Sequence, residues 1–136
     1  MTIDILIDLV GWWFDMDILT AMQTPYNFRH FNCFTMIDKV GGFGWFKDGY
    51  LKHYNESDIQ KGLDLFIDKF KIIDNVRDLR NRDVVIFDNT HAGLIYIEDG
   101  VIRVLHIEKG WNGARFEDML ILQQKYKTLR FLRWLD

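Results

Sequence analysis

The residue best able to attack a substrate is a single cysteine. Cys33 is the only cysteine among 136 residues, so it has no partner for an internal disulfide. Asn32 before it is a good N-cap, which predicts a helix from Cys33 to Val40. In the first turn of a helix the unpaired N–H groups and the macrodipole favour the thiolate, the nucleophilic form. A lone cysteine is more often a small buried hydrophobe. The position of Cys33 at the start of a helix nevertheless makes it a candidate nucleophile.

A two-residue turn fixes how the second half of the chain pairs. Asp99-Gly100 separates two apolar runs, 92–97 and 101–107. This dipeptide between strand-like runs is a strong hairpin signal. Glu98 then pairs with Val101, and the register of the whole hairpin follows.

That register brings two histidines together. His91 and His106 fall on the same face as diagonal neighbours, with backbones about 7–8 Å apart, a range at which two imidazoles can hydrogen-bond. Gly93 leaves space across from His106. A cysteine site needs a histidine base and a third group that orients it. Glu108, opposite His91, is the rival orienting group, and ordinary strand-end histidines are the plainer alternative.

Other elements follow from periodicity and turn signals. The capping box Ser57-Asp58-Ile59-Gln60 begins a helix that continues to Phe70. The remaining predictions are a helix within 2–22, a loop over 23–32, strands at 84–87 and 129–135, and a helix over 116–125. Helices come before a strand-rich half, so we expect one α+β domain spanning 1–136.

Composition excludes several classes of protein. The net charge of −3 argues against a general nucleic-acid binder. The apolar stretch Ile5–Phe14 contains Asp8 and has no basic region before it, so it is neither a secretory signal nor a membrane span. We therefore expect synthesis in the cytoplasm. The spacing of Cys33 and the four histidines matches no metal pattern, and no metal or cofactor is expected.

Several short motifs resemble the NlpC-type cysteine peptidases of the papain-like class. Residues 32–37, Asn-Cys-Phe-Thr-Met-Ile, are similar to that family's Asp-Cys-Ser-Gly-Leu-Val motif. Residues 25–29 resemble its Pro-Tyr-x-Trp-Gly lead-in, and 79–87 its Leu-x-Pro-Gly-Asp-Leu-Val-Phe-Phe strand. Residues 91–96 resemble its His-Val-Gly-Ile-Tyr motif, and 105–106 its Ile-His. The order and spacing over residues 24–120 carry the resemblance.

The resemblance implies a papain-like fold with Cys33 as nucleophile, His91 as general base and His106 as the third residue. Residues expected near the substrate are Tyr26, His30 and Asn32, with Trp45 and Trp111 as candidates for exposure beside the cleft. Short family members without a signal peptide resemble tail-assembly or tail-tip proteins of bacteriophages. The implied substrate is the peptide stem of peptidoglycan, and the implied location is a virion tail acting at the cell wall beside other tail proteins.

The chain departs from the family pattern in places. Asn32 replaces the usual Asp, Thr35 replaces a Gly, and Arg80-Asn81-Arg82 replaces a Pro-Gly turn. Two alternatives to an active peptidase follow. One is an inactive papain-like module of a phage tail, with a blocked groove or a Cys33–His91 distance too long for proton transfer. The other is a related amidase or acyltransferase.

Overall fold

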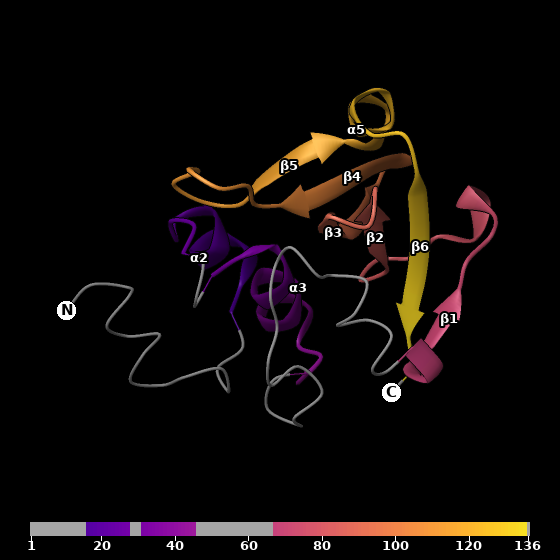
Figure 1. The fold of residues 1–136 in the computed structure, drawn as a ribbon, viewed down its shortest axis with the longest axis horizontal. Helices are drawn as coiled ribbons and strands as arrows, with labels where there is room; N and C mark the ends of the chain where they lie inside the picture. The colour runs from indigo at the N-terminus through magenta and orange to yellow at the C-terminus, as the bar shows by residue number, and fades with distance from the viewer. Residues whose placement is uncertain (1–15, 28–30, 46–66, 136) are drawn as a thin grey trace.

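The chain folds around one antiparallel sheet. The computed structural model describes residues 16–27, 31–45 and 67–135. Within them, six strands lie in the order β1-β6-β2-β3-β4-β5 (Figure 1). The strands are β1 (Phe70–Ile72), β2 (Val84–Phe87), β3 (His91–Glu98), β4 (Val101–His106), β5 (Arg115–Asp118) and β6 (Leu129–Trp134). The helices are α2 (Ile18–Met22), α3 (Cys33–Gly41) and α5 (Met119–Lys125), with 3-10 turns η3 (Ile67–Lys69) and η4 (Val76–Asp78). The prediction of an α+β fold is confirmed.

The predicted hairpin is confirmed in both turn and register. Asp99 and Gly100 have φ of 51° and 78°, and two successive positive φ values are what a type I′ turn requires. Glu98 pairs with Val101, and the same register continues to Leu94 opposite Leu105.

The helix that begins at Cys33 is also confirmed, and it runs one residue further than expected. The Asn32 side chain accepts hydrogen bonds from the backbone N–H groups of Phe34 and Thr35, and the Thr35 hydroxyl accepts one from the Asn32 N–H. This reciprocal capping box satisfies donors that a helix start leaves unpaired. Gly42, in the left-handed region at φ 67°, ends α3.

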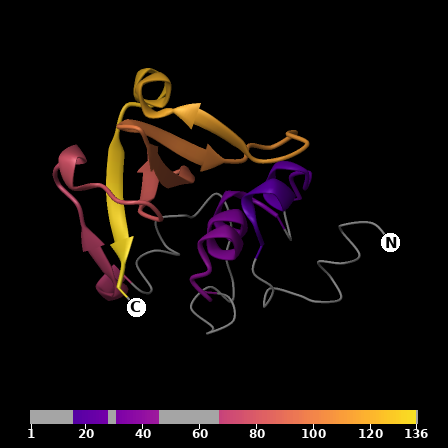
Figure 2. The same cartoon turned by 180° about the vertical axis from the view of Figure 1, so that it is seen from behind.

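Alternate side chains of the strands build two apolar clusters, one on each face of the sheet. Figures 1 and 2 show α2 and α3 below β4 and β5, and α5 above them. The α3 face contains Cys33, Phe34 and Ile37 with Val84, Ile86, Ala92, Leu94, Leu105 and Leu132. The α5 face contains Val85, Phe87, Ile95, Val104, Met119, Leu122 and Phe131.

Two element predictions need correction. The helix expected over 116–125 is strand β5 up to Asp118 and helix α5 only from Met119. Pairing with β4 holds residues 115–118 extended, and the Asp118 carboxylate caps α5 by accepting from the Leu120 N–H. The part of the helix expected from Ser57 to Phe70 that precedes residue 67 lies outside the described residues. Its predicted end is wrong, because Phe70 begins β1 and pairs with Trp134.

Candidate functional site

The two histidines meet as the hairpin register predicts. His91 Nε2 and His106 Nδ1 are 2.8 Å apart, within hydrogen-bond distance. His91 is 8% exposed and His106 is fully buried. Because buried polar groups cost free energy unless they are paired, this bond accounts for how both rings tolerate the interior.

Aromatic rings hold the pair in place. The His91 ring stacks on Phe87 and on Tyr126, with centroids 5.9 Å away in each case. The His106 ring meets the Trp111 ring edge-on at 4.9 Å. Packing on several sides restricts both imidazoles to one orientation.

Gly93 provides the room that the histidine pair needs. A Cβ at this position would overlap the Val104 side chain and would lie 3.4 Å from the Cβ of His106. The space that Gly93 was expected to leave across from His106 is occupied mainly by the Val104 side chain, so a larger residue does not fit there.

A carboxylate extends the pair on the other side of His106. Glu117 Oε1 lies 2.8 Å from His106 Nε2. Sequence reasoning missed Glu117 because residues 116–125 were expected to form one helix. Asp118 is a good helix cap, and the residues before it alternate as in a strand. These two signals could have predicted a strand that ends at Asp118 and places Glu117 beside β4.

Glu108 lies near the histidines but is engaged elsewhere. Its Oε1 accepts hydrogen bonds from Lys125 Nζ at 2.9 Å and from the Tyr126 hydroxyl at 3.0 Å. Partial burial raises the pKa of Glu108, and these hydrogen bonds outweigh that effect, so the pKa lies below its ordinary value. The group hydrogen-bonded to His91 is therefore His106, and Glu108 anchors α5 instead.

Burial sets the charge of both histidines. Burial first, and then the neighbouring His106, lower the pKa of His91 from 6.5 to about 4. Burial also lowers the pKa of His106, although its hydrogen bond to Glu117 opposes the shift. Both rings are therefore neutral near pH 7, and a neutral imidazole can accept a proton.

The same residues are the set that could hold a metal ion in the described part of the chain. One ligand atom each from His91, His106 and Glu108 lie within 4.8 Å of one another. The facing histidine nitrogens are 2.8 Å apart, whereas two nitrogens on a tetrahedral zinc ion are separated by about 3.3 Å. The two facing nitrogens are thus spaced for a hydrogen bond to each other.

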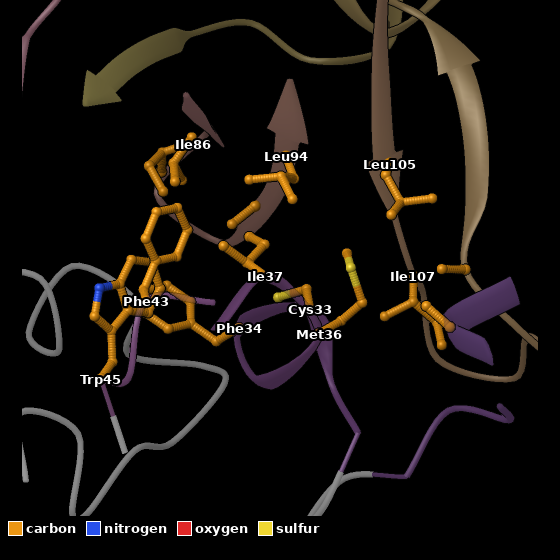
Figure 3. Close-up of a cluster of buried hydrophobic side chains, with 14 of the residues drawn as sticks. Cys33, Phe34, Met36, Ile37, Phe43, Trp45, Ile86, Leu94, Leu105 and Ile107 are labelled. Atoms are coloured by element: carbon orange, nitrogen blue, oxygen red, sulfur yellow. The ribbon is translucent and has the colours of Figure 1, made fainter. Parts of the chain in front are cut away.

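Cys33 belongs to a different cluster. It is fully buried, and Figure 3 shows it beside Ile37 and Met36. Its apolar neighbours lie on the α3 face of the sheet. His91 is opposite Phe87 in the strand pairing, so its side chain lies with that residue on the α5 face. The exposed Cys33 expected of an active enzyme is therefore not found.

Trp111 lies against both the histidine pair and the apolar cluster that contains Cys33. Its ring contacts His106 and also packs against the apolar cluster that contains Cys33. The Arg115 guanidinium lies over the Trp111 ring, 4.3 Å from its centroid. Trp111 therefore contacts both the histidine pair and the apolar cluster that contains Cys33.

The other predicted residues have mainly structural surroundings. Tyr26 is half-buried against the α3-face cluster, and its N–H donates to the Trp111 carbonyl at 2.9 Å. Asn32 is 3% exposed and caps α3. Trp45, expected near the surface, is fully buried in the core. His30 lies outside the described residues.

A hollow of about 590 Å³ lies away from the histidines, beside β1 and β6. Its charged lining residues are Lys71, Asp74, Arg77, Asp78, Arg80 and Arg133. Neither His91, His106, Glu108 nor Glu117 lines this hollow.

Comparison with known proteins finds no match for the chain. No protein-family model, curated protein or solved structure matches it. Among the described helices, none has the length and apolar character needed to cross a membrane.

Proposed function

We propose that this chain is a cysteine hydrolase that cleaves amide bonds, with His91 as its general base and Cys33 as its nucleophile. The observation that supports the proposal best is the 2.8 Å hydrogen bond between His91 and His106. It gives His91 what a catalytic base needs, which is a fixed ring orientation and a partner that sets its tautomer.

The proposed reaction is an acyl transfer in two stages. His91, neutral because its pKa is about 4, takes the thiol proton of Cys33, and the sulfur attacks the amide carbonyl carbon. The C–N bond breaks as the His91 imidazolium protonates the leaving amine, which leaves a thioester. His91 then removes a proton from water, the resulting hydroxide displaces the sulfur, and the thiol is restored.

The proposal places a requirement on α3. Cys33 is in the first turn of a nine-residue helix with a capping box at its start, where the helix dipole favours a thiolate. For proton transfer its sulfur must come within hydrogen-bond reach of the His91 ring. Because Cys33 and His91 lie on different faces of the sheet, the proposal requires the first turn of α3 to extend beyond the end of β3, where the two side chains can meet.

The proposed substrate is the peptide stem of peptidoglycan, cleaved by a bacteriophage tail protein at the bacterial cell wall. This part of the proposal rests on the resemblance of residues 24–120 to NlpC-type peptidases, with Cys33, His91 and His106 in that family's order. A related amidase or acyltransferase would use the same residues on another amide or ester. Purified peptidoglycan and a panel of small amides and esters separate these two activities.

The decisive experiment is the pH dependence of Cys33 alkylation by iodoacetamide. Because neutral His91 would remove the thiol proton as the sulfur attacks, we expect Cys33 to be alkylated near pH 7 faster than an ordinary thiol of pKa about 8.5, and this excess rate to be lost in His91→Ala. Thr90→Ala, an exposed neighbour in the turn before β3, is the matched control and should behave as the wild type. A thiol that titrates like free cysteine whether or not His91 is present contradicts the hydrolase proposal.

Digestion of peptidoglycan tests the substrate. Mass spectrometry of the soluble products should show new free carboxyl and amino ends within the peptide stems. Cys33→Ser and His91→Ala should each abolish them. If a preparation with a reactive Cys33 releases no stem fragments but hydrolyses other amides, the substrate proposal is wrong and the chemistry stands.

The burial of Cys33 favours a second candidate, a papain-like module of a phage tail that performs no turnover. Cys33 is fully buried among apolar side chains, as a structural cysteine would be. This candidate predicts that Cys33 is alkylated only when urea unfolds the protein. Alkylation of the folded protein at a rate that depends on His91 argues against it.

A further inference from the structure

Glu117 reaches the histidine pair from the edge of the sheet. It lies on β5 opposite Val104, two residues along β4 from His106. Since alternate residues of a strand share a face, Glu117 is on the same face as His106. Its side chain is 28% exposed, whereas the His106 ring is fully buried and lies 2.8 Å from the carboxylate. Glu117 therefore connects the buried pair to solvent.

The order of acceptors and donors along this line fixes the position of every ring proton. A carboxylate only accepts hydrogen bonds, so His106 Nε2 carries a hydrogen and donates to Glu117. A neutral imidazole has one N–H, so His106 Nδ1 is an acceptor. His91 Nε2 must then donate to it across 2.8 Å. The lone pair of His91 is left on Nδ1.

We propose that Glu117 is a positioning residue that sets the tautomers of both histidines and makes Nδ1 of His91 the proton acceptor. The inference rests on the proposed role of His91 as a base, and it adds a fourth residue to the nucleophile, base and orienting histidine. Glu117 acts through His106 and touches neither the nucleophile nor the base.

Glu117 has a second effect once His91 accepts a proton. The imidazolium donates from Nε2 to His106, which donates to a negative charge, so the carboxylate stabilises the protonated base through the buried ring. Other charged or titratable groups around His91 are Glu108 after β4, Lys125 at the end of α5 and Tyr126, the C-cap of α5. None of these three is the carboxylate hydrogen-bonded to His106, which is Glu117.

The test is nitrogen-15 NMR of the imidazole rings in the intact protein near pH 7, since the chemical shifts report which nitrogen is protonated. In the wild type we expect both His91 and His106 as Nε2–H tautomers. In Glu117→Ala, His106 should become a mixture of tautomers and His91 should lose its single form. Glu117→Gln retains an acceptor oxygen and should keep the tautomers only in part, because the amide can also present its NH₂ group.

A matched variant separates Glu117 from the other nearby carboxylate. Glu108→Gln removes a charge at a similar site, but the Glu108 carboxylate is bonded to Lys125 and Tyr126. We expect it to leave both tautomers unchanged. If Glu108→Gln alters them and Glu117→Gln does not, the inference is overturned and Glu108 is the positioning residue.

The outcomes for Glu117 and for the hydrolase are distinct. A wild-type His91 protonated at Nδ1 overturns the role of Glu117 without any variant. If the tautomers depend on Glu117 but Cys33 never reacts in the folded protein, Glu117 keeps its role and the hydrolase proposal fails. If both hold, Glu117→Ala should slow Cys33 alkylation about tenfold or more, as expected for a base in the wrong tautomer.

Discussion

His91 and His106 are buried side by side at one end of the sheet, and their surroundings leave them little choice of charge. A protonated imidazole would lose most of its hydration there, and charging both rings would add repulsion. The hydrogen bond between the rings satisfies them in the neutral state. Their neutrality is therefore a property of the fold and does not depend on a substrate.

This burial predicts a specific pH dependence of stability. The pKa of His91 is about 4 in the folded state and 6.5 ordinarily, so the unfolded chain binds the proton first as pH falls. Stability is fully present above about pH 6.5 and is lost progressively down to about pH 4, by on the order of 1–3 kcal/mol. Urea unfolding across this range measures the loss.

The control is His91→Gln, which has no titratable group at this position. Its free energy of unfolding should be lower at neutral pH but should change less between about pH 6.5 and pH 4. If wild type and His91→Gln show the same pH slope in that range, another group is responsible for the loss.

The β3–β4 hairpin is the element that positions the histidines, and it depends on two glycines in different ways. Gly100 supplies a positive φ of 78° in the turn and has open space around it. Gly93 is tightly packed against Val104 and next to the Cβ of His106. The first glycine serves the backbone conformation, and the second serves packing.

We therefore predict different results for alanine at the two sites. Gly93→Ala should force Val104 and His106 to move and should destabilise the fold by about 1–3 kcal/mol, as overpacking does. Gly100→Ala should cost about 1 kcal/mol through backbone strain alone. Only Gly93→Ala should change the imidazole nitrogen shifts of His106. Equal shifts in both variants would contradict the packing argument.

The elements that sequence could predict are those specified by local chemistry. Asn32 and the glycines after α3 mark its two ends, and Asp99-Gly100 fixes the hairpin register, so these were correct. Residues 116–118 were misassigned because pairing with β4 overrides a helical pattern. Phe70 was misassigned because its partner, Trp134, is distant in the sequence.

At the scale of the whole molecule, a partly buried ion pair connects β6 to the segment before β2. Both carboxylate oxygens of Asp83 lie 2.8 Å from the Arg133 guanidinium, and Asp83 also accepts from the Arg80 N–H. Asp83 is 1% exposed. Arg133 also donates to the Asp78 carbonyl, so it fastens the loop around η4 to the sheet.

Removing one partner of this pair should be costly. Asp83→Ala leaves the Arg133 charge without its carboxylate, and we expect a loss of about 2–4 kcal/mol. Lys125→Ala breaks the more exposed pair with Glu108 and should cost less than about 1 kcal/mol. Chemical denaturation of both variants compares the two. Similar losses would mean that the Asp83 pair behaves as a surface pair.

The candidate site was predictable only where the hairpin defined it. The meeting of His91 and His106 follows from a two-residue turn, and the structure confirms it. The approach of Cys33 depends on how α3 packs across the sheet, and no turn or spacing in the sequence specifies that packing. Glu117 was missed for a different reason, because residues 116–118 were expected to be helical and instead pair with β4 as strand β5.

The strand order has a consequence for synthesis on the ribosome. β6 lies between β1 and β2, although it follows all the other strands in the chain. The hairpins from β2 to β5 can form as they emerge, but β2, a Val-Val-Ile-Phe strand with every residue buried in the finished fold, keeps an open apolar edge until residues 129–134 appear. During that interval another nascent chain could pair with it. The newly made protein is therefore most exposed to aggregation just before its last strand inserts.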